Sequence, residues 1–205
     1  MTILTVTLNA AIDKRYDVPE VSVGRVQRVE KVVATAGGKG LNVTRGALLS
    51  GHAAIATGFV GGFAGAFVTS EVAAMGAREE FVRVAGETRT CINIIDTAGA
   101  STEFLEPGVT IGPDDLAELR SRFGELLTEA DVVTLSGSAP PGCPADVYVP
   151  LIAAAKAAGR PVILDTSGDL LSAGIIAGPR VVKPNRDELA ALVGTPVGDP
   201  VSVVA

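Results

Sequence analysis

Segments typical of β-strands alternate with segments typical of α-helices along most of this 205-residue chain. Short runs rich in β-branched residues predict strands, and longer runs with apolar residues three or four positions apart predict helices. The predicted strands are 3–8, 53–60, 132–135, 162–164 and 181–182, and the predicted helices are 40–50, 65–75, 113–127, 146–158, a short one after Gly168, and 186–193. Such alternation predicts a parallel sheet with helices on both faces, which binds ligands beyond the carboxyl ends of its strands.

The helix predicted over 113–127 has the clearest pattern. Pro113 suits the first helical position, and two aspartates follow it in the first turn, where they complement the helix dipole. One face of this helix carries Leu116, Leu119, Phe123 and Leu126. We expect this face to be buried against the sheet.

Two regions interrupt the alternation, at about 15–33 and 88–106. Each contains two strand-like runs with no helix between them, and both are interpreted as antiparallel strands. Together they predict a small sheet beside the α/β body. We expect the whole chain, residues 1–205, to form one domain that includes this small sheet.

Composition excludes several classes of protein. Hydrophobic residues make up 47% of the chain and charged residues 20%, which is typical of a globular protein. A net charge of −6 argues against a nucleic-acid partner. The two cysteines, far apart in the sequence, fit a reducing, cytoplasmic location. The uncharged stretch 53–70 is long enough to span a membrane, but its four glycines favour a strand, a turn and a helix instead.

A glycine-rich segment, AGGKGLNVTR, occupies residues 36–45. Gly37 and Gly38 let the backbone approach a ligand closely, and Lys39 places a positive charge beside them. Asn42 follows on the helix that begins here, and a helix N-terminus favours anions. Glycines alone would indicate a plain turn, but together with Lys39 and Asn42 they indicate a site for a phosphorylated, polyhydroxylated molecule.

This segment and five others, in the same order, resemble the PfkB carbohydrate kinases of the ribokinase-like superfamily, most of all the 1-phosphofructokinase and tagatose-6-phosphate kinase branch. The other segments are TLNAAIDK at 7–14, GFVGGFAG at 58–65, TRTCINI at 88–94, LSGSAPPG at 135–142 and VVKPNRDEL at 181–189. One glycine-rich motif is a weak signal, whereas six in register are a strong one.

The resemblance implies a three-layer ribokinase-like fold in which the small sheet forms a lid over the sugar. It also implies ATP and Mg²⁺ as cofactors, a sugar phosphate as substrate and a possible homodimer through the lid. The family's Gly-Ala-Gly-Asp segment, which carries the catalytic aspartate, is absent from these 205 residues. We therefore expect an incomplete kinase domain without its catalytic base, and hence no activity of this chain alone.

The resemblance also assigns sugar-binding residues. Asp13 matches the family's sugar-binding loop, although a lone loop aspartate is more often simply solvated. Arg28 and Arg89 stand where the resembling kinases contact phosphate, with exposed arginines as the alternative. Ser138 lies in a loop after a predicted strand, where a rigid turn and a substrate contact are equally compatible with the chemistry.

The N-x-x-E element at Asn185 and Glu188 resembles the family's magnesium-organising motif, with Glu188 acting through water. Asn followed by Glu three residues later is equally a helix capping box, and both roles are compatible. Lys183, just before this element, is expected to meet nucleotide phosphates. Asp199 and Pro200 predict a further helix start.

Other candidates are rejected or left structural. The sequence DTAGAS at 96–101 superficially resembles the catalytic motif but lacks its final glycine and aspartate. Asp165 is expected at a strand end away from the acceptor, and Cys91 is expected to pack near the sugar rather than act as a nucleophile. The sequence thus predicts a sugar-phosphate kinase lineage, with a non-catalytic sugar-phosphate-binding protein as the alternative. A nucleoside kinase is disfavoured, because its unphosphorylated acceptor would leave Lys39 without a purpose.

Overall fold

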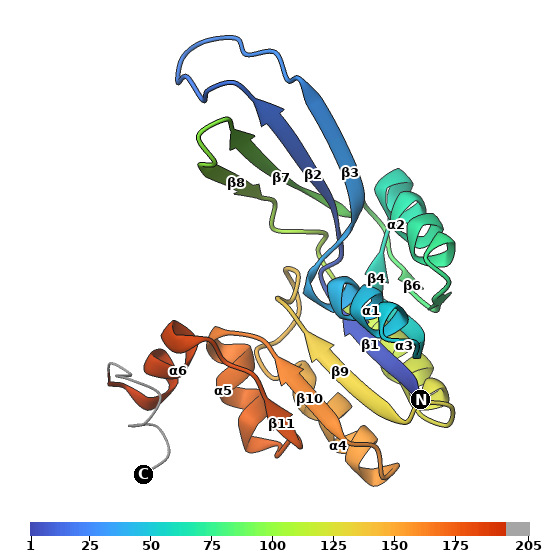
Figure 1. Cartoon of the computed structure of the whole chain (residues 1–205). Helices are drawn as coiled ribbons and strands as arrows, with labels where there is room; N and C mark the ends of the chain where they lie inside the picture. Colours follow the sequence, from blue (N-terminus) through green and yellow to red (C-terminus); the bar gives the residue numbers. More distant parts are fainter. Residues whose placement is uncertain (196–205) are drawn as a thin grey trace.

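The computed structural model describes residues 1–195 and shows a central sheet with a smaller sheet projecting from it (Figure 1). The α/β class predicted from the strand–helix alternation is confirmed, as is the separate small sheet. The helix start expected at Asp199 and Pro200 lies outside the described residues.

The central sheet is parallel in all of its described pairings. Its strands lie in the order β11 (Val181–Val182), β10 (Val162–Asp165), β9 (Val132–Ser136), β1 (Thr2–Thr7), β4 (Ala53–Val60) and β5 (Arg78–Glu79), and β6 (Val82–Arg83) pairs with the end of β4. The chain runs outward from β1 first through β4 and β5, and later through β9, β10 and β11. The carboxyl end of β1 is therefore a switch point of strand order, where such sheets bind ligands.

Helices cover both faces of this sheet and make it the middle of three layers. The helices α1 (Lys39–Leu49) and α2 (Gly62–Ala74) pack on one face, whereas α3 (Pro113–Leu126), α4 (Tyr148–Ala157) and α5 (Gly168–Ile176) pack on the other. The last described helix, α6 (Arg186–Val193), contacts α5 and has no buried residue. The predicted arrangement of helices on both faces is confirmed.

Strand β4 contributes apolar side chains to both faces of the central sheet. Ile55 and Phe59 belong to the apolar cluster under α3 and α4, while Ala56 and Val60 belong to the cluster under α1 and α2. Successive side chains of a strand point to opposite faces, so a continuous apolar run suits a strand covered on both sides.

The stripe expected on the helix at 113–127 is confirmed in α3. Its members Leu116, Leu119, Phe123 and Leu126 are all buried in the larger cluster. The helix ends at Leu126, one residue before the predicted end, and an aspartate in its first turn accepts the Gly112 N–H at 2.8 Å.

The lid sheet, as we name the smaller sheet, contains β3 (Lys31–Gly37), β2 (Ala11–Val18), β7 (Arg89–Asp96) and β8 (Ser101–Leu105) in that order. Each of its two hairpins is antiparallel, as expected, but β2 and β7 pair in parallel and the sheet is therefore mixed. The first hairpin also extends beyond the expected 15–33, from Ala11 to Gly37, because the backbone pairing of β2 with β3 continues through four further pairs toward the central sheet.

The uncharged stretch 53–70 forms β4 and the first part of α2, as the sequence predicts. No helix within residues 1–195 has both the length and the apolar character that crossing a membrane requires.

Candidate functional site

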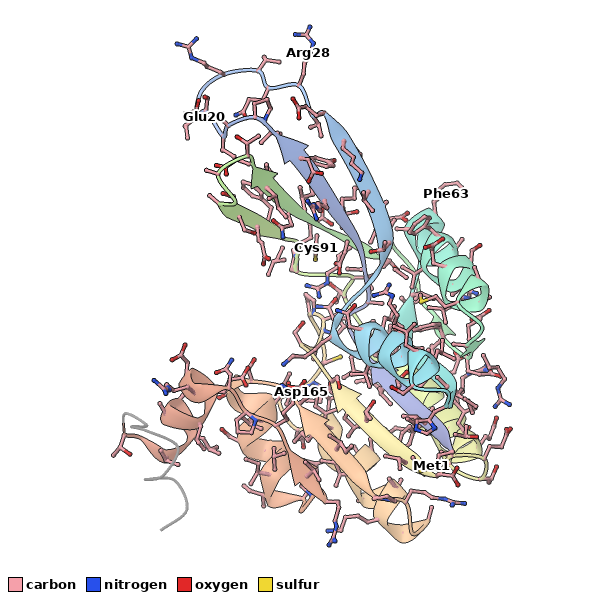
Figure 2. All side chains as sticks on the ribbon, in the orientation of Figure 1. Met1, Glu20, Arg28, Phe63, Cys91 and Asp165 are labelled. Atoms are coloured by element: carbon pink, nitrogen blue, oxygen red, sulfur yellow. The ribbon has the colours of Figure 1, made fainter. Side chains whose placement is uncertain are left out.

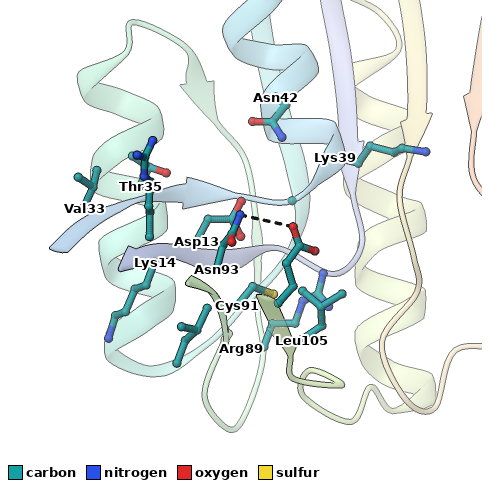
Figure 3. A pocket seen from close by; sticks show the side chains of 14 residues that line it. Asp13, Lys14, Val33, Thr35, Lys39, Asn42, Arg89, Cys91, Asn93 and Leu105 are labelled. Carbon is teal, nitrogen blue, oxygen red and sulfur yellow. Dashed lines mark hydrogen bonds between the residues drawn. The ribbon is translucent and has the colours of Figure 1, made fainter. Parts of the chain in front are cut away.

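A cavity of about 680 Å³ lies between the lid sheet and the start of α1 (Figure 3). Its walls come from β2, β3, β7 and β8 of the lid sheet and from the first turn of α1. Five of the residues predicted from sequence line it, namely Asp13, Gly38, Lys39, Asn42 and Arg89. The site thus lies near the carboxyl end of β1, where the topology favours a ligand.

Asp13 lies within β2 rather than in a loop after the first strand. Its carboxylate sits against Gly37 of β3, and a Cβ at Gly37 would overlap it. Burial raises the pKa of the Asp13 carboxyl above its ordinary value, and the N–H of Gly38 and the charge of Arg89 act in the opposite direction. Gly37 therefore makes room for a half-buried carboxylate that faces the cavity.

Gly38 is the residue just before α1, with a φ of 104° that only glycine adopts readily. This turn directs the first residues of α1 toward the cavity, and Lys39 and Asn42 both line it. The amide oxygen of Asn42 accepts a hydrogen bond from Arg45 Nη1 at 2.9 Å. The glycine-rich segment therefore forms a helix N-terminus at the site, as predicted.

Asp165 is the last residue of β10, and its carboxylate forms ion pairs with two of the predicted cationic residues. Its Oδ1 lies 2.7 Å from Lys39 Nζ and its Oδ2 lies 3.3 Å from Lys183 Nζ. Sequence reasoning placed Asp165 at a strand end, as the structure does (Asp165 is labelled in Figure 2), but it did not predict the ion pair with Lys39, a residue that lines the cavity. Its position at the carboxyl end of a parallel strand was the signal that could have found it.

Arg89 lies at the base of β7, where its guanidinium contacts backbone carbonyls. Nη1 donates to Glu106 O at 3.1 Å and Nη2 donates to Asn9 O at 3.0 Å. Arg28, in contrast, lies in the loop between β2 and β3 at the far end of the lid sheet (Figure 2), and is not among the described residues that line the cavity. The structure brings Arg89 to the site but not Arg28.

Ser138 lies in the loop after β9, one residue beyond Gly137. A Cβ at Gly137 would lie 3.2 Å from Lys39 Cβ, so the loop packs against the start of α1. Ser138 Oγ accepts a hydrogen bond from Asn9 Nδ2 at 3.3 Å. The loop therefore borders the site, although Ser138 is not a lining residue of the cavity.

Cys91 lines the cavity two residues after Arg89, as expected from strand alternation. Burial raises the pKa of the Cys91 thiol, which favours the neutral form. Cys91 is thus a buried thiol at the cavity wall, and a packing role near the sugar stays a prediction.

Comparison with known proteins identifies the family to which the chain belongs. A family model for pfkB family carbohydrate kinases matches residues 6–205. The chain belongs to this family. The family assignment made from the six sequence segments is thereby confirmed.

Solved structures of relatives agree with this assignment. A possible 1-phosphofructokinase from Thermotoga maritima is 32% identical, with a TM-score of 0.91, and the match covers 100% of this chain and 67% of that one. Phosphofructokinase-2 from Escherichia coli, in complex with fructose-6-phosphate, is 30% identical with a TM-score of 0.87, over 98% of this chain and 67% of that one. A tetrameric inhibited form of the same enzyme is 31% identical with a TM-score of 0.90, over 98% of this chain and 66% of that one. The chain spans about two thirds of the length of these pfkB relatives.

The N-x-x-E element of this pfkB chain begins α6, and the predicted capping box is confirmed. Asn185 Oδ1 accepts from Glu188 N and Glu188 Oε2 accepts from Asn185 N, both at 2.8 Å. Within the described residues, no cluster of three or more His, Cys, Asp or Glu side chains could hold a metal ion directly. A single carboxylate with one oxygen beyond the cap suits Mg²⁺ held largely through water, since Mg²⁺ retains several waters.

Sequence reasoning missed five polar residues of the cavity: Lys14, Arg15, Thr35, Asn93 and Glu103. Asn93 Nδ2 donates to Glu103 Oε1 at 3.5 Å across the β7–β8 hairpin, as Figure 3 shows. Alternation along β2 and β7 could have placed Arg15 and Asn93 on the same face as Asp13 and Cys91. The sequence did not predict that these two strands are neighbours, because the pairing of β2 with β7 is parallel and joins two separate hairpins.

Proposed function

We propose that the cavity binds a phosphorylated ketohexose, and that this chain is the sugar-binding part of a phosphofructokinase-like kinase. The observation that carries this proposal is the meeting of Asp13 with Lys39 and Arg89 around one cavity. A carboxylate accepts hydrogen bonds from vicinal hydroxyls, and ammonium and guanidinium groups bind phosphate. The fructose-6-phosphate complex of the Escherichia coli relative supports this class of ligand.

Charge around the cavity favours a phosphorylated acceptor over a nucleoside. Lys14, Arg15, Lys39 and Arg89 carry positive charge there, against the carboxylates of Asp13 and Glu103. Arg89 makes two backbone hydrogen bonds and Lys39 is paired with Asp165, so a phosphate would share the Lys39 ammonium with the Asp165 carboxylate. An uncharged acceptor would make no use of this positive charge.

Phosphoryl transfer to the 1-position would require a general base at the acceptor hydroxyl. The Gly-Ala-Gly-Asp segment that supplies it in the resembling kinases is absent from these 205 residues. Asp165 cannot replace it, because both of its oxygens are paired with lysines. Asp13 faces the sugar hydroxyls instead. We therefore propose a chain that binds a sugar phosphate without transferring phosphate by itself.

ATP and Mg²⁺ fit the other side of the site. Lys183 lies next to the N-x-x-E element, where its ammonium would meet nucleotide phosphates, and Glu188 would orient magnesium-bound water. Bound Mg²⁺ supplies charge neutralisation of the phosphates. In this proposal Asp165 links the sugar side to the nucleotide side through its two lysine partners.

The exposed surface of the lid sheet favours a second copy of this chain as the partner, in a homodimer. Val32 and Phe104 are each 58% exposed on the lid sheet, on strands β3 and β8. Exposed apolar side chains on a small sheet favour burial against another copy, and the Escherichia coli relative forms a tetramer. Sedimentation velocity should show a dimer that a Val32→Lys/Phe104→Lys variant converts to monomer; monomeric wild type would contradict this arrangement.

The sugar site is tested by calorimetry with fructose 6-phosphate on the wild type, on Asp13→Asn and on a matched control. The control is Asp131→Asn, since Asp131 accepts the Thr2 N–H near the opposite end of the sheet. We expect Asp13→Asn to weaken binding at least about tenfold, because hydrogen bonds to a charged group contribute about 1.5–3 kcal/mol each. Asp131→Asn should leave the affinity unchanged. Equal affinities of all three proteins would contradict the assignment of the cavity.

A further inference from the structure

Asn9 lies where the chain passes between the two sheets, on the three residues that join β1 to β2. It is 7% exposed, and both its side chain and its backbone carbonyl form hydrogen bonds. Nδ2 donates to Pro107 O at 3.0 Å and to Ser138 Oγ at 3.3 Å, while its backbone carbonyl accepts from Arg89 Nη2 at 3.0 Å.

The chain crosses between the central sheet and the lid sheet four times, and each crossing lies against Asn9. The first crossing contains Asn9 itself. The second contains Gly38, where a Cβ would lie 3.5 Å from Asn9 O. The third reaches Asn9 through Arg89, and the fourth contains Pro107 and Gly108, where a Cβ at Gly108 would overlap the Asn9 amide. The backbone carbonyl of Asn9 thus contacts the second and third crossings, and its side chain contacts the fourth.

The orientation of the Asn9 amide is fixed by its partners. The carbonyl of Pro107 can only accept a hydrogen bond, so the NH₂ group of Asn9, not its oxygen, must face Pro107. The same NH₂ group then donates to Ser138, whose Oγ accepts. The Ser138 hydroxyl proton is left to point elsewhere, and Ser138 becomes a donor toward its surroundings.

We propose that Asn9 is a positioning residue with two effects: it holds the lid sheet against the central sheet, and it makes Ser138 a hydrogen-bond donor to an oxygen of the sugar phosphate. The second effect rests on the proposed function, whereas the first does not. Asn9 itself does not line the cavity. It acts through the lid crossings and through Ser138.

Two substitutions separate these effects. Asn9→Asp keeps the shape of the side chain but places a carboxylate oxygen against Pro107 O, and it makes Ser138 donate to the new carboxylate. Ser138→Ala removes only the hydroxyl and leaves the Asn9–Pro107 bond in place. Ser172→Ala is the matched control, because the Ser172 hydroxyl donates to Gly168 O on α5, away from the cavity.

The measurements are hydrogen–deuterium exchange of the β2 and β7 amides, and calorimetry with fructose 6-phosphate and fructose. We expect Asn9→Asp to raise amide exchange in the lid about fivefold or more and to weaken fructose 6-phosphate binding by a similar factor. Ser138→Ala should weaken fructose 6-phosphate binding several-fold with unchanged lid exchange. In the double variant, the loss should be smaller than the product of the two single losses. Ser172→Ala should change neither quantity.

Unchanged lid exchange in Asn9→Asp, or single losses that multiply in the double variant, would overturn the proposal. If Asn9→Asp does not fold, Ser138→Ala alone decides, because unaltered fructose 6-phosphate binding there would refute the donor role. If the wild type binds no sugar phosphate, the proposed function fails. The exchange of the lid amides in Asn9→Ala then still tests whether Asn9 holds the lid sheet against the central sheet.

Discussion

At the scale of single residues, the site depends on glycines, whose lack of a Cβ leaves room for neighbouring charged side chains. Gly37 gives space to the Asp13 carboxylate, and Gly137 gives space to the stem of Lys39. These contacts join residues that are 24 and 98 positions apart in the sequence (37 − 13 and 137 − 39). Both glycines are therefore needed for packing of the site.

Gly37→Ala should abolish most of the affinity for fructose 6-phosphate, because the new methyl group displaces the Asp13 carboxylate. The control is Gly46→Ala on α1, where a Cβ meets nothing within 4 Å. That control should keep full affinity and gain up to about 1 kcal/mol of stability from helix propensity. Calorimetry and thermal unfolding measure both; wild-type affinity of Gly37→Ala would refute the steric role.

Asp13 also predicts a pH dependence of stability. Its pKa in the folded protein is raised by burial, so the folded state favours the protonated form more than the unfolded state does. The stability that this preference contributes is present below the ordinary aspartate pKa of about 3.9, and it is lost as the pH rises through the raised pKa. Asp13→Asn should therefore raise the melting temperature at pH 7, with a smaller gain near pH 4. A lower melting temperature of Asp13→Asn at pH 7 would contradict the shift.

At the scale of elements, helix α3 is the part whose burial the sequence predicted most completely. Its apolar stripe and its N-terminal signals agree, so local propensity and packing favour the same structure. The two-residue strands β5 and β6 were not predicted, because such short segments carry no periodic pattern. Asp13 was expected in a loop because β2, read as AIDKRYDV, has polar residues on both faces and no apolar run.

Phe123→Ala in α3 should destabilise the protein by about 3–5 kcal/mol, since Phe123 is fully buried in the larger apolar cluster. Phe63→Ala on α2 is the matched comparison, because Phe63 is 92% exposed and points away from the body of the protein (Figure 2). That variant should change stability by less than about 0.5 kcal/mol. Denaturant unfolding measures both; similar costs at the two positions would contradict the assignment of the core.

At the scale of the whole molecule, the sequence predicted the layers and the lid sheet but not which distant residues meet at the site. The six family segments located Lys39 and Asp13, yet the Lys39–Asp165 pair joins residues 126 positions apart and required the order of the parallel strands. Arg28 shows the opposite case, since it stands where the resembling kinases contact phosphate, whereas the folded chain places it at the far end of the lid sheet. Long-range register, rather than residue type, decides these positions.

The 205-residue chain should release no sugar-dependent ADP in a coupled assay. A general base contributes about 10²–10⁴-fold to such a reaction, and the Asp165 carboxylate is already paired with Lys39 and Lys183. A version extended through a Gly-Ala-Gly-Asp segment serves as the comparison. Equal sugar-dependent rates from both proteins would overturn the assignment of the base.

The central claim is that the cavity recognises the phosphate as well as the hydroxyls of its ligand. The most direct test is calorimetry of the wild-type chain with fructose 6-phosphate and with fructose, in the same buffer and at the same salt concentration. We predict that fructose 6-phosphate binds at least about tenfold more tightly, because charged hydrogen bonds to phosphate contribute about 1.5–3 kcal/mol each. Equal affinities for the phosphorylated and the free sugar would contradict the claim.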